Sequence, residues 1–222
     1  MNQWNRRDGV GGFVWEVTNP ADDKTVGTLR YVLEHATEFG DMIVIGEDVY
    51  HIELESVLLL TKRLHIVGPC ILARKDGAGG GIISVTSSGD VTLSHITLSP
   101  GDRDSGVAIS NDGRLALTRC RLLGNRAMRG GGGSVRNHGT MAMEGCTIAW
   151  NAGDLSGGGI FNSGSLTFSG CVLQENVVRI GDDSGATPIM LSKSGDADDF
   201  PSRATLYIPL SETRTRRKFR VI

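Results

Sequence analysis

The sequence predicts an all-β protein whose chain winds into a parallel β-helix, a solenoid of stacked coils, with a short helix capping its N-terminal end. Two features of the 222 residues predict this fold. A turn glycine recurs about every 25 residues, within the range of solenoid repeats. Within each repeat the apolar residues lie two apart, then three, then two, which indicates short strands bent around one axis. The turn glycines are Gly89, Gly113, Gly139 and Gly164.

Apolar residues occupy matching positions in these repeats and are expected to line the interior. One repeat alone cannot bury its inner face, so neighbouring coils must stack, about 4.8 Å apart. The predicted columns are Val91, Leu115, Met141 and Leu166; Leu93, Leu117, Met143 and Phe168; Ile96, Cys120, Cys146 and Cys171; Leu98, Leu122, Ile148 and Leu173; and Val85, Ile109, Val135 and Ile160. Because cysteine is commonly buried and shares its column with an isoleucine, core packing is favoured over metal binding or a disulfide.

Asparagine also recurs at two positions of the repeat. Asparagine tolerates left-handed turns, and stacked amides hydrogen-bond to one another along an axis. We therefore interpret the asparagines as two structural ladders. Their members are Asn111, Asn137 and Asn162, and Asn125, Asn151 and Asn176.

The elements divide the chain into three parts. Residues 1–41 contain a strand at 14–17 and the capping helix, whose apolar residues have helical spacing and for which Thr28 can serve as N-cap. Residues 42–176 form the coils. Residues 177–222 contain a loop, a possible last strand at 204–210 and a basic tail. The apolar face of the predicted helix consists of Leu29, Val32, Leu33 and Ala36.

The coil before Gly89 is aligned with the later coils by a constant difference in residue number. Leu64, Ile66 and Ile71 match the inner columns at one constant shift. That shift predicts that Cys70 lies outside the cysteine column and points elsewhere.

Composition excludes several classes of protein. With 23 Lys and Arg against 25 Asp and Glu, the net charge of −2 argues against a generally basic nucleic-acid-binding protein. The chain has no apolar run long enough for a transmembrane helix, and the polar stretch 1–8 does not resemble a signal peptide. The 4 cysteines have neither zinc nor redox spacing, so no metal or cofactor is expected.

Arginines supply the candidate ligand-binding residues, which are Arg114, Arg119, Arg121 and Arg136. Arg119 and Arg121 flank an inward cysteine, so both should point outward. Guanidinium groups match carboxylates and sulfates, so a cationic stripe here can hold an acidic polysaccharide. The competing interpretation is a solvated face balanced by acidic residues. Arg126 and Arg129 lie in the same two coils, and the acidic residues are Asp102, Asp104, Asp112 and Glu144.

Three N-terminal segments carry a family resemblance. The stretches 17–23 (VTNPADD), 27–33 (GTLRYVL) and 41–45 (DMIVI) resemble the entry of pectate-lyase-like right-handed β-helix proteins. The stretch 157–160 (GGGI) with 173–176 (LQEN) is similar to the GGGI…N repeats of bacterial surface β-helix proteins, including the polymorphic membrane proteins. The resemblance implies a right-handed single-stranded β-helix and an extracellular or cell-surface location.

The function stays open between alternatives. The first is a non-catalytic module of a bacterial surface or secreted protein, for adhesion or for binding an acidic polysaccharide or host cell-surface ligand. The second is a polysaccharide lyase, for which the resemblance implies an arginine base, here Arg119 or Arg121, beside a Ca²⁺ held by aspartates. Scattered acidic residues and histidines favour the first. A third alternative is a relic that keeps only the scaffold.

Overall fold

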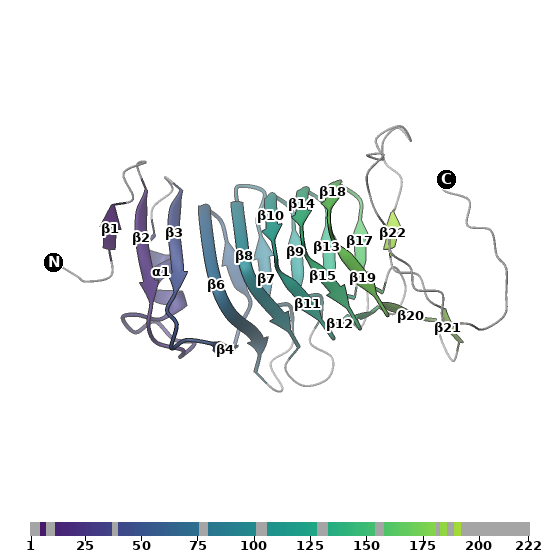
Figure 1. Cartoon of the computed structure of the whole chain (residues 1–222), viewed down its shortest axis with the longest axis horizontal. Coiled ribbons are helices and arrows are strands. Elements are labelled where there is room, and N and C mark those ends of the chain that lie inside the picture. Colours follow the sequence, from purple (N-terminus) through teal and green to yellow (C-terminus); the bar gives the residue numbers. More distant parts are fainter. Residues whose placement is uncertain are drawn as a thin grey trace.

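The computed structural model describes residues 5–7, 12–36, 40–75, 80–100, 106–127, 133–153, 158–180, 183–185 and 189–191, with side chains between residues 12 and 177. Over these residues the strands stack along one axis into a parallel β-solenoid with one short helix (Figure 1). The predicted fold class is confirmed. The division into three parts stays a prediction, and the basic tail and the strand expected at 204–210 lie outside the described residues.

The described strands form three sheets, of which the longest begins at Asn5, the second begins at Leu58, and the third is confined to the later coils. The 12-stranded sheet contains β1 (Asn5–Arg7), β2 (Phe13–Val17), β3 (Asp41–Ile45), β4 (His51–Leu54), β6 (Arg63–Arg74), β8 (Asp90–Ser99), β10 (Arg114–Thr118), β11 (Arg121–Leu123), β14 (Thr140–Glu144), β15 (Thr147–Ala149), β18 (Ser165–Ser169) and β19 (Val172–Gln174). The six-stranded sheet contains β5 (Leu58–Leu60), β7 (Ile83–Val85), β9 (Ile109–Asn111), β13 (Val135–Asn137), β17 (Ile160–Asn162) and β22 (Ile189–Leu191). The four-stranded sheet contains β12 (Arg126–Ala127), β16 (Ala152–Gly153), β20 (Val177–Ile180) and β21 (Asp183–Gly185).

The predicted helix is α1 (Leu29–His35), at the N-terminal end of the solenoid beside β2 and β3 (Figure 1). The Thr28 hydroxyl accepts a hydrogen bond from the Tyr31 backbone N–H at 3.2 Å, which satisfies one of the unpaired amides of the first turn. Leu29 and Val32 are buried in the same core as the coils. The helix and its N-cap are therefore confirmed, and the helix covers apolar side chains at this end.

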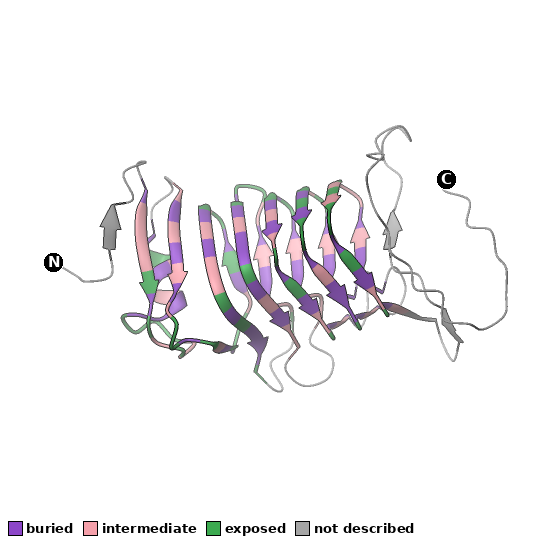
Figure 2. Ribbon diagram, viewed as in Figure 1, coloured by how far each residue is buried: buried purple, intermediate pink, exposed green. Residues whose placement is uncertain are grey.

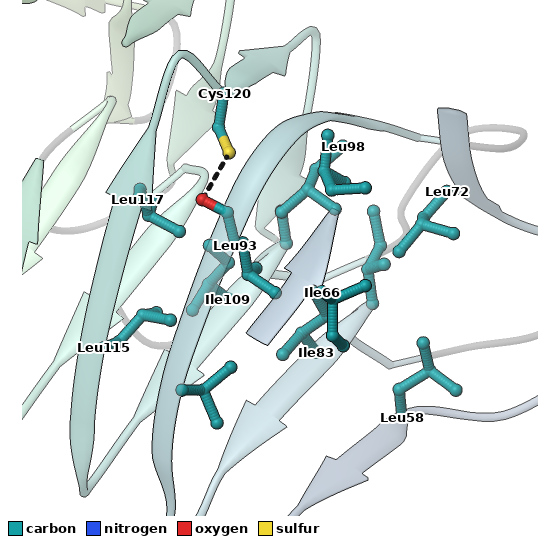
Figure 3. Packing of buried hydrophobic residues seen from close by; sticks show 14 of the residues in the cluster. Leu58, Ile66, Leu72, Ile83, Leu93, Leu98, Ile109, Leu115, Leu117 and Cys120 are labelled. Carbon is teal, nitrogen blue, oxygen red and sulfur yellow. Dashed lines mark hydrogen bonds between the residues drawn. The ribbon is translucent and has the colours of Figure 1, made fainter. Parts of the chain in front are cut away.

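The interior columns follow the strand register. Leu115 pairs with Val91 and Met141, and Leu117 pairs in the same way with residues of β8 and β14. Burial alternates along these strands, since inward residues are covered and their neighbours face solvent (Figure 2). Aliphatic side chains from the opposing sheets meet between them and fill the interior (Figure 3).

The prediction for Cys70 was wrong. Strand β6 shifts register between Val67 and Cys70, so Cys70 pairs with Ile96 and joins the cysteine column. Cys70 is 4% exposed. The prediction that Ile71 matches an inner column was also wrong, because Ile71 pairs with Thr97 and is 40% exposed, while Leu72 pairs with Leu98. The corner of this coil contains two residues, Gly68 and Pro69, whereas the equivalent corner in β8 contains only His95. The extra residue shifts the register.

The fifth predicted column was also misaligned. Ile83, not Val85, pairs with Ile109, and Val85 pairs with Asn111. Four residues separate Val85 from β8, whereas two separate Asn111 from β10. Aligning the turn glycines therefore displaced this strand by two residues.

Both asparagine ladders are present and buried. In the first, the Nδ2 of Asn111 donates to the Oδ1 of Asn137, and the Nδ2 of Asn137 donates to the Oδ1 of Asn162, each at 2.6 Å. The second ladder joins Asn125, Asn151 and Asn176 at 3.1 and 2.8 Å. A buried amide without partners is costly, so these residues stabilise the coils only because each neighbour supplies the next partner. The structural interpretation of the asparagines is confirmed.

The turn glycines allow a close approach between successive coils. A Cβ on Gly139 would lie 2.1 Å from the Gly113 carbonyl oxygen, and one on Gly164 would lie 2.1 Å from that of Gly139. The obstructing atoms belong to the backbone and cannot move aside like a flexible side chain. Glycine is therefore required here by lack of space.

The cysteines pack in the core. All four are free and buried. The Cys120 thiol donates to the Leu93 carbonyl at 3.3 Å (Figure 3), and the thiols of Cys146 and Cys171 reach the preceding coil in the same way at 3.4 Å. Burial raises the pKa of Cys70 to about 12. The neighbouring Cys120 thiol, together with burial, raises the pKa of Cys146 to about 11.

Replacing the central turn glycine should destabilise the solenoid. We expect Gly139→Ala to lower the free energy of unfolding by about 2 kcal/mol or more, because the added methyl group overlaps the backbone of the preceding coil. Urea unfolding followed by circular dichroism measures this loss. Thr140→Ala, on the exposed face of β14, is the control and should cost about 1 kcal/mol or less. Equal stability of the two variants would show that the turn can open.

Alkaline pH should weaken the fold through the buried thiols. The pKa of each thiol is higher in the folded state than in the unfolded state. The contribution of the thiols to folding stability is therefore complete below the unfolded-state pKa of about 8.5. It is lost as the pH rises through about 11 for Cys146 and about 12 for Cys70. The comparison is urea unfolding across this pH range for the wild type and for Cys70→Ala/Cys146→Ala, whose unfolding should depend less on pH. Parallel pH profiles would contradict the assignment.

Candidate functional site

The candidate arginines sit on two adjoining strands and the corner between them. Arg114 opens β10, Arg121 opens β11, and Arg119 forms the corner. All three are exposed. Arg114 and Arg121 are adjacent to the inward-facing Leu115 and Cys120, respectively, and Arg119 points outward from the corner. We call these three residues the arginine ridge.

The corner at Arg119 turns the chain within one residue. Arg119 has φ 52°, in the left-handed region, and the equivalent residues His95, Gly145 and Gly170 have φ between 59° and 61°. The Arg119 backbone N–H donates to the Glu144 carbonyl at 2.8 Å, which holds the corner to the next coil. A Cβ on Gly145 would lie 3.5 Å from the Arg119 Cγ. The aliphatic stem of Arg119 therefore lies beside a residue that has no side chain.

The other two ridge residues pair with threonine or aspartate residues of the neighbouring coils. Arg121 lies between Thr97 and Thr147 in the neighbouring coils. Arg114 lies between Asp90 and Thr140. Asp90 is also approached from its other side by Arg63, at 3.8 Å. Asp90 therefore lies between Arg63 and Arg114 in the stack and approaches the guanidinium group of Arg63.

The ridge side chains have no ion pair with any residue that the structure describes. Of the acidic residues proposed to balance them, Asp112 and Glu144 are exposed. Asp102 and Asp104 lie outside the described residues. The ridge guanidinium groups are therefore open to solvent and to a ligand, as far as the described chain shows.

Arg136 is separated from the ridge. It lies in the middle of β13, in the six-stranded sheet, where its neighbours in the stack are Ser110 and Phe161. The outer faces of the two sheets point away from each other across the core (Figure 1). The structure thus places three of the four predicted ligand-binding residues in one coil and on the same sheet. Arg126 begins β12 and is half-buried, and Arg129 lies outside the described residues.

A second group of arginines is structural. The Arg30 Nη2 donates to the Asp22 Oδ2 at 2.9 Å, and the Asp22 carboxylate also accepts from the Glu55 backbone N–H. The buried Arg74 donates to the Glu55 carbonyl oxygen at 3.2 Å. These contacts tie α1 and its preceding loop to the early coils. Arginines committed to the scaffold are therefore paired, in contrast with the ridge.

Sequence reasoning missed two polar contacts on the outer face. The His65 Nε2 lies 3.0 Å from the Ser94 hydroxyl, and burial lowers the pKa of His65. At the corner that follows β15, the exposed indole of Trp150 donates from Nε1 to the Glu175 Oε2 at 2.8 Å. Gly124, Trp150 and Glu175 each precede an asparagine of the second ladder, and this shared place in the repeat was the available signal.

The described residues contain neither a metal-binding cluster nor a helix able to span a membrane. No three His, Cys, Asp or Glu side chains come together there in an arrangement able to hold a metal ion. The helical residues described include no segment with the length and apolarity needed to cross a bilayer.

Comparison with known proteins agrees with this geometry. The model of a family described as "Right handed beta helix region" matches residues 70–191, more than half of the chain. No curated protein matches the chain. The matched region contains the arginine ridge, both asparagine ladders and the turn glycines from Gly89 onward. The family includes pectate-lyase-like enzymes and non-catalytic surface proteins. The chain belongs to the right-handed β-helix family.

Proposed function

We propose that the chain is a non-catalytic binding module that holds an acidic polysaccharide against the arginine ridge. The observation that carries this proposal is the exposure of three guanidinium groups, at Arg114, Arg119 and Arg121, without a described ion-pair partner. Arginine donates through a planar fork that fits a carboxylate, so a row of such groups suits a polymer that repeats an anionic group.

The scaffold favours this use of the ridge. Stacked coils hold their outward residues at a fixed spacing, because every coil is hydrogen-bonded to the next in register. The threonines beside Arg121 add hydroxyl groups that can bond to sugar hydroxyls. A preorganised surface loses less entropy on binding than a flexible one.

The surroundings of the ridge favour binding over catalysis. In the lyase alternative, Arg119 or Arg121 acts as the base beside a Ca²⁺ held by several carboxylates. The stack neighbours of Arg121 are Thr97 and Thr147, and those of Arg119 are His95 and Gly145, so these positions supply no carboxylate. We therefore propose adhesion or glycan capture, with an extracellular or cell-surface location following from the resemblance to surface β-helix proteins.

Removing the ridge charges should weaken binding of polygalacturonate. We expect Arg119→Ala/Arg121→Ala to lower the affinity about tenfold or more, since each charge-assisted hydrogen bond contributes roughly 1.5 to 3 kcal/mol. Affinity electrophoresis or calorimetry at two salt concentrations measures this effect. The wild type should lose affinity as salt rises, and the double variant should lose less.

Arg136→Ala is the matched control, because it removes the same charge from the other sheet and should leave the affinity within about twofold. Equal losses in the control and the double variant would contradict a binding role specific to the ridge. Incubation with polygalacturonate and Ca²⁺ tests the alternative, since release of unsaturated products with ultraviolet absorbance would overturn the non-catalytic assignment.

A further inference from the structure

The corner after β15 carries an aromatic side chain in an unusual backbone position. Trp150 has φ 58°, in the left-handed region that glycine occupies most easily. The equivalent residues of the neighbouring coils, Gly124 and Glu175, have φ of 68° and 51°, so the left-handed corner is shared by three successive coils. A bulky residue is uncommon in this conformation, and here the corner of the coil imposes it. Trp150 is 55% exposed, so its large ring does not serve to fill the core.

The contacts around Trp150 fix its position. Its backbone N–H donates to the Gln174 carbonyl at 3.0 Å, and its indole N–H donates to the Glu175 Oε2 at 2.8 Å. The other Glu175 oxygen accepts from the Gln174 Nε2 at 3.1 Å. The next residue, Asn151, is a buried member of the second asparagine ladder. Trp150 is therefore an exposed ring held by its backbone, its indole nitrogen and the adjacent ladder.

The corner is close enough to the ridge for one oligosaccharide to contact both. Thr147 pairs with Arg121 in the neighbouring coil, and Trp150 follows three residues later. Strand geometry then puts the Cα atoms of Arg121 and Trp150 roughly 11 Å apart. Strands β11 and β15, which lie between them, pair in register.

We propose that Trp150 is a stacking platform for an uncharged sugar ring, and that the ligand of the ridge is an acidic heteropolysaccharide in which uronate and neutral pyranose units alternate. This inference rests on the proposed function of the ridge. The C–H face of a pyranose packs on an aromatic ring, and an exposed tryptophan has one apolar surface and one polar edge. Glu175 bonds to hydroxyl groups but repels a carboxylate, so the sugar at Trp150 is neutral while its neighbour reaches the arginines.

Hyaluronan and polygalacturonate are the two probes, because the first alternates uronate with a neutral sugar and the second contains uronate alone. Trp150→Gly removes the ring and, like Gly124, accommodates the left-handed corner, so the fold should persist by circular dichroism. We expect this variant to bind hyaluronan about tenfold more weakly, to bind polygalacturonate within about twofold of the wild type, and to retain the salt dependence.

Tryptophan fluorescence gives a second readout. Hyaluronan should change the emission of the wild type but not that of Trp150→Gly. Tyr50→Ala, at another exposed aromatic residue, should bind both polymers like the wild type.

The possible failures are distinguishable. If the wild type binds neither polymer, the proposed function and this inference both fail. If it binds polygalacturonate but not hyaluronan, or binds hyaluronan with an affinity and emission that do not depend on Trp150, the platform is overturned and the ridge remains.

Discussion

Backbone hydrogen bonding between coils in register is the interaction on which the rest of this structure depends. A coil has almost no backbone partners within itself, so its amides and carbonyls are satisfied by the coils on either side. Once the register is set, like positions stack, and each side chain must suit the residue above and below it. The glycines with no room for a Cβ and the amides that bond in series are consequences of this constraint.

Most of the scaffold could be predicted because residues at matching positions of the sequence repeat pair with one another in neighbouring coils. The columns through Leu115, Leu117, Cys120 and Leu122 were confirmed residue by residue where coils have equal corners and turns. The errors at Cys70 and Val85 arose where neighbouring coils use different numbers of residues to turn. Apolar spacing within strands reveals inward residues, but it does not reveal how many residues a corner consumes.

The ridge was predictable in part for the same reason. Alternation with an inward cysteine indicated that Arg119 and Arg121 face outward, but it gave no information on which sheet carries Arg136. That distinction depends on the cross-section of a coil, which only the folded chain supplies. Trp150 was overlooked because the search for apolar columns passes over corner residues, whose backbone conformation rather than spacing gives them their direction.

The second asparagine ladder also bears on how such a molecule changes in length. Asn125 and Asn151 each donate to the amide of the next coil and to a backbone carbonyl of the preceding coil, and the coils from Gly113 onward have similar turns, corners and interior residues. Duplication of one entire coil would therefore leave every interior contact with an acceptable partner, while a partial duplication would break both ladders. The genetic unit that this architecture can gain or lose is the complete coil, so the reach of its outer face can evolve in discrete steps without a new core.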